Sequence, residues 1–324
     1  MPGNGPYKMR TIARMTEFSP ALLRAWERRH GLLHPLRGSG GHRMYTEEDL
    51  QILLRVRELI RQGRSIGEIA GVGREALLRE SDGRVPERPG GPPPKREKLG
   101  AETLGELHDQ SEQIVAAALA MDQRSIDRAL DECFSRVSPE SVIFEVIEPA
   151  TRSIGELWAA GKCSVASEHI ATGAFVHRLL KLVESAAPVR SDHRPVIVSC
   201  FPDEYHQLGA LIVSYHLSRH GLRVSYMGAA LPFEDLESAC DVLRPSAVLL
   251  SATRPALFQL HRKALAETAR RAGRRAPFYV GGQGAPQSDP LLEHFGVRFP
   301  AKAGSQREAL DVLAEELRET AVAI

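Results

Sequence analysis

The chain has 324 residues, of which 43% are hydrophobic and 26% charged, as is typical of a globular protein with two or three domains. No apolar stretch reaches the ~20 residues that a membrane-spanning helix needs. The N-terminus lacks the apolar segment of a secretory signal, and the four cysteines have neither disulfide-framework nor metal-site spacing. These features argue against a membrane or disulfide-rich protein and predict a cytoplasmic one.

The net charge of +1 conceals an uneven distribution along the chain. Residues 1–80 carry 14 Lys+Arg against 9 Asp+Glu, a net charge of +5, so the remaining 244 residues sum to −4. A small basic module on a mildly acidic body predicts that a polyanion binds the N-terminal end.

The first 80 residues predict a helix-turn-helix followed by a basic wing. In TIARMTEFSPALLRAWERRHGLL a short helix and a turn precede a second helix, with Ser19 as its N-cap and Pro20 in its first turn. Trp26 is expected in the core. A glycine-rich basic loop follows, and then a helix capped at Thr46 with acids in its first turn. A single arginine in this region would merely lie on a solvated helix face, so the interpretation depends on the whole order of elements.

This order, with the pattern R.WERRHGLL.P.R...GHR.Y...DL..L..I..L...G.SI.EI, resembles the DNA-binding domain of MerR-family transcription regulators over about residues 9–75. The resemblance implies that the second helix enters the major groove and that the wing contacts phosphates. MerR proteins dimerise, so a roughly palindromic double-stranded operator is expected. By this resemblance the DNA contacts are Arg24 and Arg28 on the helix, and Arg43 and Tyr45 on the wing.

Two further regions follow the basic module. Residues 81–100 are rich in proline, glycine and charge and have no apolar periodicity, which predicts an extended linker. Residues 101–188 predict helices only, because apolar residues recur at intervals of three and four, as in a four-helix bundle. Ser138 and Pro139 mark one helix start within it.

The pattern changes in residues 189–324. Short apolar runs (PVIVSC, LRVSYMG, AVLLSA, PFYVGG and VRFPA) alternate with amphipathic segments, which predicts βαβ units and a doubly wound parallel sheet. The expected fold class is therefore multidomain α and α/β, with a winged helix-turn-helix, a four-helix bundle and a Rossmann-like domain. Ligands of such sheets bind beyond the carboxyl ends of the strands.

The stretch DEYHQLG follows the first of these strands and matches the D/E-x-H-x-x-G signature of cobalamin-binding domains. In isolation, a histidine at a strand–helix junction is more often a capping or surface group. Its position directly after the first parallel strand instead favours a histidine that binds a ligand. The resemblance implies that His206 is the lower axial ligand of cobalt, through Nε2. Glu204 is expected to hydrogen-bond the other ring nitrogen, with Asp203 as a less favoured substitute. Gly209 would leave room for the displaced nucleotide tail.

Other cofactor contacts are expected at the ends of the third and fourth strands: Ser251, Thr253, Gly281 and Gly282. The two glycines would offer bare backbone to a bulky group. His216 and His220 also have metal-ligand spacing on the following helix. No third ligand is evident from the sequence, so we interpret this pair as a solvated helix face.

The bundle contains Trp158, then Glu168 and His169, in the spacing W-x9-E-H. Alone, this would be a buried tryptophan and a polar helix start. Together with the other motifs it resembles CarH-type light-dependent regulators, in which the bundle covers the upper face of adenosylcobalamin. The resemblance spans nearly the whole chain. It implies that Trp158 lies over the adenosyl group and that Glu168 and His169 contact this group or the corrin.

One position departs from that family. In its best-known member a histidine follows the tryptophan and becomes the upper cobalt ligand after photolysis, whereas here the residue is Ala159. A bis-histidine light state at this position is therefore excluded. Substitutes are open at this stage: His169, His177 or Cys163.

The resemblance implies a promoter-binding repressor that senses light through adenosylcobalamin and changes between a tetramer and smaller species. Two alternatives stay open. The first is a MerR regulator that responds to cobalamin or another tetrapyrrole, or to nothing, without that light state. The second is a corrinoid enzyme subunit, against which the DNA-binding module argues. No membrane partner and no catalytic residue are expected.

Overall fold

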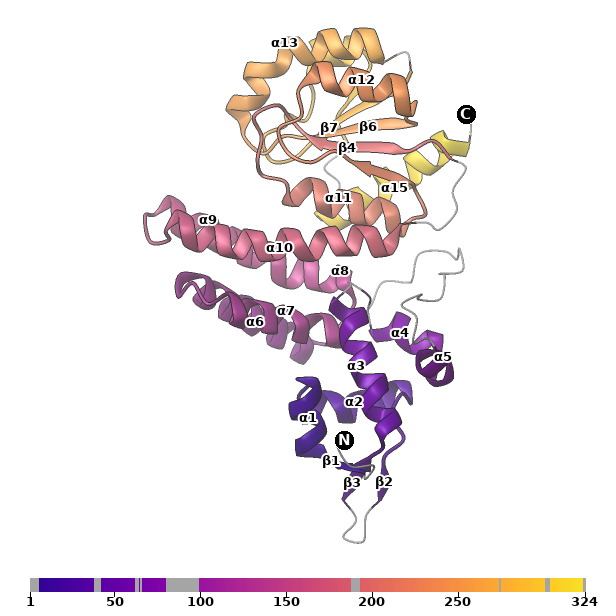
Figure 1. Ribbon diagram of the computed structural model, residues 1–324. Coiled ribbons are helices and arrows are strands. Elements are labelled where there is room, and N and C mark those ends of the chain that lie inside the picture. The colour runs from indigo at the N-terminus through magenta and orange to yellow at the C-terminus, as the bar shows by residue number, and fades with distance from the viewer. Residues whose placement is uncertain are drawn as a thin grey trace. The chain divides into compact units, whose positions relative to one another are not determined.

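The computed structural model describes residues 6–37, 42–61, 64, 66–79, 99–187, 193–273, 275–300 and 304–322. The chain forms two compact units, one containing the helix-turn-helix and the bundle up to Ser185, the other the α/β domain from Ala186 onward (Figure 1). Residues 38–41 of the expected wing and residues 81–98 of the expected linker lie outside the described residues. None of the described helices has the length and apolarity to cross a membrane.

The first unit begins with the expected helix-turn-helix and wing. Its elements are β1 (Tyr7–Lys8), α1 (Met9–Thr16), α2 (Pro20–His30), β2 (Leu36–Arg37), β3 (Arg43–Tyr45), α3 (Glu47–Arg61), α4 (Ile66–Val72) and α5 (Arg74–Arg79). The strands form an antiparallel sheet in the order β1-β3-β2. The expected cap of α2 is confirmed, because Leu22 N donates to Ser19 Oγ at 3.2 Å. The tight turn before it uses Glu17 at φ 63°.

Trp26 lies in the core, as expected. Its side chain is buried, and its ring packs edge-on against Phe18 at a centroid distance of 4.7 Å. Its indole Nε1 donates to Ser135 O at 3.1 Å, so this polar atom is satisfied within the interior. Ser135 belongs to helix α7 of the bundle. The second helix of the helix-turn-helix is thus bonded directly to the bundle of the same unit.

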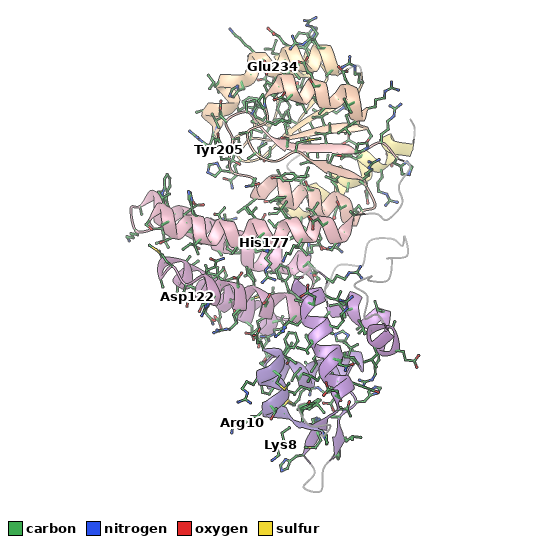
Figure 2. All side chains as sticks on the ribbon, in the orientation of Figure 1. Lys8, Arg10, Asp122, His177, Tyr205 and Glu234 are labelled. Atoms are coloured by element: carbon green, nitrogen blue, oxygen red, sulfur yellow. The ribbon has the colours of Figure 1, made fainter. Side chains whose placement is uncertain are left out.

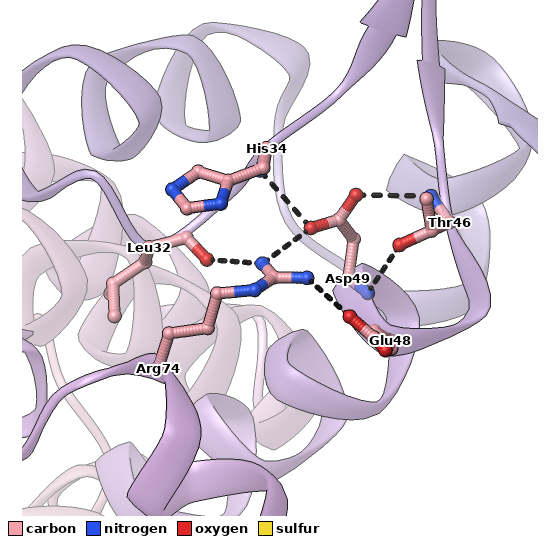
Figure 3. A network of polar contacts seen from close by, with 6 residues as sticks. All are labelled: Leu32, His34, Thr46, Glu48, Asp49 and Arg74. Atoms are coloured by element: carbon pink, nitrogen blue, oxygen red, sulfur yellow. Dashed lines mark hydrogen bonds and ion pairs between the residues drawn. The ribbon is translucent and has the colours of Figure 1, made fainter.

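A buried carboxylate joins three segments of the helix-turn-helix domain (Figure 3). Asp49, in the first turn of α3, accepts from Thr46 N at 3.0 Å and from His34 N at 3.1 Å. Arg74, at the start of α5, donates to the same carboxylate at 2.7 Å and to Leu32 O at 2.9 Å. Thr46 Oγ1 in turn accepts from Asp49 N, which completes a capping box. This network holds the chain after α2, the start of α3 and α5 together.

The bundle follows within the same unit. Its elements are α6 (Ala101–Leu119), α7 (Gln123–Arg136), α8 (Pro139–Val142), the π-helical turn η1 (Ile143–Ile147), α9 (Glu148–Ala159) and α10 (Val165–Ala186). The expected helices are confirmed, and Ser138 Oγ accepts from Ser141 N as the expected N-cap. One expected helix differs, because the π turn interrupts it immediately before Pro149. Proline has no N–H and its ring clashes with the carbonyl four residues earlier, so the α-helical ladder is broken there.

The second unit is a Rossmann-like domain with a five-stranded parallel sheet. Its strands are β4 (Val196–Cys200), β5 (Val224–Tyr226), β6 (Ala247–Ser251), β7 (Phe278–Gly281) and β8 (Val297–Arg298). Its helices are α11 (Leu208–Arg219), α12 (Phe233–Leu243), α13 (Pro255–Ala272), α14 (Pro290–His294) and α15 (Gln306–Val322). Helices α12 and α13 cover one face, and α11 and α15 the other (Figure 1).

The strand order β5-β4-β6-β7-β8 positions the candidate site. From β4 the chain first moves to β5 on one side and then crosses to β6 on the other. The carboxyl end of β4 is therefore the topological switch point, where open α/β sheets bind ligands. The expected doubly wound fold is confirmed.

Candidate functional site

The loop after β4 begins with a compact turn. Asp203 adopts φ 62°, in the left-handed region that aspartate tolerates better than most residues. The turn is closed by Glu204 N, which donates to Phe201 O at 3.1 Å, while Ala230 N, after β5, donates to Glu204 O at 3.0 Å. The backbone of Glu204 is thus fixed to both neighbouring strand ends.

The Glu204 side chain is fully buried and bonded at both oxygens. Oε1 lies 2.5 Å from His206 Nδ1 and 3.1 Å from His206 N. Oε2 accepts from Thr253 N and Arg254 N, both at 3.0 Å, where the chain leaves β6. The carboxylate therefore joins the β4 and β6 ends of the sheet and orients the histidine.

The charge of this carboxylate decides which nitrogen of His206 is free. Burial by itself raises the pKa of Glu204, but the hydrogen bonds from His206, Arg254 and Thr253 outweigh burial and lower the pKa below its usual value. An ionised carboxylate only accepts hydrogen bonds, so Nδ1 of His206 carries a proton, and in the neutral imidazole Nε2 is then the nitrogen with the lone pair. The His206 side chain is 62% exposed. An exposed Nε2 opposite an anchored Nδ1 is the usual arrangement of a metal-binding histidine.

The structure separates the two acids that flank this turn. Asp203 is exposed and lies 3.0 Å from His261 Nε2 on α13, away from the ring of His206. Glu204 has the position next to His206 Nδ1. The Tyr205 side chain between them is 73% exposed. Figure 2 labels this residue on the α/β domain.

The expected contacts at the strand ends have different roles in the structure. Gly209 faces Ser251, and a Cβ added at Gly209 would lie 3.6 Å from Ser251 Oγ, an ordinary contact distance. Thr253 reaches the site through its backbone N–H rather than its side chain. Gly281 has open space where a Cβ would be.

Gly282 and Gly284 are required by the packing of the backbone itself. Gly282 has φ 105°, and an added Cβ would lie 2.4 Å from Ala252 O. A Cβ at Gly284 would lie 2.6 Å from Arg254 C. Both glycines support the segment that donates to Glu204. Sequence reasoning missed Gly284 and Arg254, although VGGQG contains the signal of a close backbone approach.

Gly282→Ala is therefore expected to destabilise the α/β domain by at least about 2 kcal/mol, since both the positive φ and the contact with Ala252 oppose a side chain. Gly281→Ala is the matched control, because its Cβ enters open space. Thermal unfolding of the two variants without cofactor measures the difference. Equal melting temperatures would contradict this assignment.

The expected upper-face residues lie around the turn between α9 and α10. Trp158 is 53% exposed at the end of α9, which is unusual for so large an apolar side chain. On α10, Glu168 Oε2 lies 2.5 Å from His169 Nδ1, and Glu168 Oε1 accepts from Thr172 Oγ1 at 2.6 Å. The same carboxylate thus orients His169 and leaves its Nε2 at the exposed edge of the ring. Thr172 was not anticipated from the sequence.

The candidate replacements for the missing histidine differ in accessibility. Ala159 is the last residue of α9. His169 is exposed, and His177 is exposed two turns further along α10, where Figure 2 labels it. Cys163 is buried, with Sγ directed to Ser164 O at 3.5 Å.

The helix-turn-helix domain presents a basic surface on α2. Arg24 and Arg28 are exposed there, as the interpretation required. Arg43 is ion-paired with Glu27 at 2.8 Å, so its guanidinium is oriented against α2. Lys8 and Arg10 are also exposed, and their side chains project from this domain (Figure 2). Sequence reasoning did not single out these two residues.

The expectation that Tyr45 contacts DNA is wrong for its side chain in this structure. Tyr45 is fully buried beneath the wing, and its hydroxyl lies 3.7 Å from Met9 Sδ. Burial raises its pKa to about 12. A tyrosine on a short wing strand can face either solvent or the interior, and here the Tyr45 side chain packs in the interior.

Comparison with known proteins assigns each part of the chain. Residues 7–75 match the MerR HTH family of regulatory proteins, and residues 110–180 and 194–306 match two families of B12 binding domain. The chain superimposes on the monomethylamine corrinoid protein of Methanosarcina barkeri with a TM-score of 0.50 at 17% identity, covering 65% of this chain and 99% of that one. This similarity concerns the fold. The class is thus a MerR-type regulator with B12-binding domains.

Two relatives align with most of the chain. The HTH-type transcriptional repressor CarH of Myxococcus xanthus is 31% identical over 291 residues, 90% of this chain and 93% of CarH. The repressor CarA of the same organism is 31% identical over 295 residues, 90% of this chain and 92% of CarA. The chain therefore belongs to the CarH/CarA family of MerR-type regulators.

Proposed function

We propose that this protein is a transcriptional repressor that binds promoter DNA through residues 7–75 and binds adenosylcobalamin in its α/β domain. The observation that carries the proposal is the pair formed by Glu204 and His206, with Nδ1 anchored and Nε2 exposed at the switch point of the sheet. Membership of a family that includes two named repressors supports a regulator rather than a corrinoid enzyme subunit.

The residues at the site suit a corrinoid. His206 would donate Nε2 to cobalt as the lower axial ligand, and Glu204 would keep its tautomer fixed and raise its basicity. Gly209, Ser251 and Gly281 would border the nucleotide tail of the cofactor, with Thr253 and Gly282 supporting the backbone around it. Asp203 would orient the loop through His261.

On the bundle, Trp158, Glu168 and His169 are proposed to contact the upper ligand of the cofactor. When bound, adenosylcobalamin supplies a cobalt–carbon bond that light can break. The exposed indole of Trp158 would cover this group and exclude water from it. Glu168 would hold His169 in one orientation.

The proposed signal acts on assembly. A ligand shifts an equilibrium between assembly states only as far as its affinities for those states differ. We propose that the cofactor-bound form in darkness is a tetramer that occupies a palindromic promoter site in the cytoplasm. Illumination would dissociate this tetramer and release the DNA.

Ala159 favours a second version of this function. With no histidine at that position, the protein would respond to cobalamin, or to a related tetrapyrrole, without the bis-histidine light state. In this version the cofactor controls DNA binding, and illumination changes neither assembly nor affinity.

The test uses the full-length protein with adenosylcobalamin in darkness. Absorbance, molecular mass and promoter affinity are measured before and after green light. The proposal predicts bound corrinoid, a tetramer in darkness, and loss of mass and promoter affinity after light. If cobalamin binds but light changes neither mass nor affinity, the second version holds and the light-sensing part is wrong. If no corrinoid binds, the cobalamin proposal itself fails.

A further inference from the structure

A cluster of three metal-ligating side chains lies between α11 and α15, separate from the cofactor loop. His216 is in α11, His220 is the C-cap residue of the same helix, and Asp311 is in α15. Among the described residues, no other group of three or more His, Cys, Asp or Glu side chains has converging ligand atoms, and those of this cluster all lie within 4.8 Å of one another. The expectation of a solvated helix face is therefore wrong for His216, whose side chain is only 4% exposed. The third ligand comes from 91 residues further along the chain, so spacing could not reveal it.

The geometry fixes the tautomer of one histidine. His220 Nδ1 lies 2.8 Å from His216 O. A carbonyl oxygen only accepts, so Nδ1 carries a proton, and in the neutral imidazole Nε2 is then the nitrogen with the lone pair. This lone pair is 3.8 Å from Asp311 Oδ1, and His216 Nε2 is 3.1 Å from the same oxygen. A backbone carbonyl that holds the far nitrogen of the ring is a common support for a metal-bound histidine.

The distances are close to those that a metal ion requires. Ligand atoms about 2.1 Å from a tetrahedral zinc ion lie about 3.4 Å from one another. The two nitrogen–oxygen distances here, 3.1 and 3.8 Å, fall on either side of that value. All three ligand atoms lie within 4.8 Å of one another, so changes in the side-chain torsion angles would bring them onto one ion.

We propose that His216, His220 and Asp311 bind one divalent transition-metal ion. Two imidazole nitrogens and one carboxylate oxygen suit zinc and its neighbours in the first transition row, rather than magnesium or calcium, which prefer oxygen ligands. Three protein ligands leave the remaining coordination positions to water. The ion links α11 to α15 over the core formed by Ala210, Leu217, Leu313, Ala314 and Leu317.

The position of the ion suggests its role. Helix α11 begins at Leu208, directly after the loop that carries His206, and α15 is the last helix of the chain. An ion bound to both helices stabilises the folded α/β domain, because the unfolded chain does not hold the three ligands together. It is a structural metal ion that links the two helices covering one face of the sheet, α11 and α15 (Figure 1).

The test is a Zn²⁺ titration of the full-length protein after treatment with EDTA and dialysis. Competition with a chromogenic chelator gives the affinity, and elemental analysis gives the stoichiometry. The wild type is expected to bind one equivalent and to show a higher melting temperature with Zn²⁺ than with Mg²⁺. Asp311→Asn and His220→Gln are each expected to weaken Zn²⁺ binding at least tenfold and to remove the shift in melting temperature.

His108→Gln is the matched control, because His108 also lies 3.5 Å from an acid, Glu112, but is exposed on a single helix. It should leave Zn²⁺ binding unchanged. Asp311 is partly exposed, so its replacement tests the site without opening the core. The proposal is overturned if the wild type retains no stoichiometric Zn²⁺, or if both site variants bind it as tightly as the wild type. It is equally overturned if His206→Ala alone removes the bound equivalent.

Discussion

His206→Ala is expected to lower the affinity of the full-length protein for adenosylcobalamin by more than about 100-fold. Loss of a partner that only orients a metal ligand costs roughly 10–100-fold, and His206 is proposed as the ligand itself. Its side chain is exposed, so its removal should leave the fold intact, although loss of the hydrogen bond to the buried Glu204 should lower the melting temperature of the cofactor-free protein. Titration in darkness, followed by absorbance, measures the affinity.

Glu204→Gln separates orientation from ligation. Glutamine has the same shape, but its NH2 group replaces one carboxylate oxygen. At least four donor groups hydrogen-bond to the two oxygens of Glu204 in this buried site, so in the variant some of these donors would face the NH2 group. The affinity for cobalamin is expected to fall by about 10–100-fold. The melting temperature should also fall, because hydrogen bonds to a charged group contribute about 1.5–3 kcal/mol each.

His294→Ala, on an exposed histidine of the same domain, is the control. If His206→Ala binds adenosylcobalamin as tightly as this control does, the ligand assignment is wrong.

Asp49→Asn is expected to destabilise the DNA-binding domain by about 3 kcal/mol. The variant removes the negative charge opposite Arg74 and places an NH2 donor against the N–H of Thr46 or of His34. Removing one partner of a buried ion pair costs about 3 kcal/mol or more. Burial raises the pKa of Asp49, but the hydrogen bonds from Thr46, Arg74 and His34 lower it overall. The contribution of the carboxylate is therefore present above its unfolded pKa of about 3.9, and is lost as the pH falls through the lower folded-state pKa.

Glu48→Ala provides the matched control for this prediction. Glu48 also contacts Arg74, at 3.1 Å, but its side chain is 66% exposed, so the variant should cost less than about 1 kcal/mol. The chain has two tryptophans, and Trp26 lies in the DNA-binding domain. Its fluorescence in a Trp158→Phe background reports unfolding of this domain in urea. If Asp49→Asn and Glu48→Ala unfold at the same urea concentration, the network does not stabilise the domain.

Much of the fold follows from local patterns in the sequence. The alternation of buried strands with amphipathic segments identified every strand of the parallel sheet, because burial on both faces leaves continuous apolar runs. Ser19, Thr46 and Ser138 marked helix starts through the hydrogen bonds that they accept. The π turn before Pro149 was not predictable, because proline is equally acceptable in the first turn of a new helix.

The candidate site was predictable only in its local part. The spacing of Glu204 and His206 brings the two side chains together within one turn. By contrast, the bonds from Thr253 and Arg254 to Glu204 depend on the register of β4 against β6, which the sequence does not reveal. Tyr45 and Arg74 show the same limit in the DNA-binding domain. Whether each residue faces solvent or the interior is decided by segments distant in the chain.

The π-helical turn Ile143–Ile147 sets the direction in which the rest of α9, including Trp158, faces. Each residue of an α-helix turns the chain by about 100° and advances it by about 1.5 Å. Deleting one residue from the turn would rotate the rest of α9 by about that angle relative to the helix before it. The indole of Trp158 would then leave its exposed position without any change of its own. A single insertion or deletion upstream can thus reorient this surface, a change that substitutions at the surface itself cannot make.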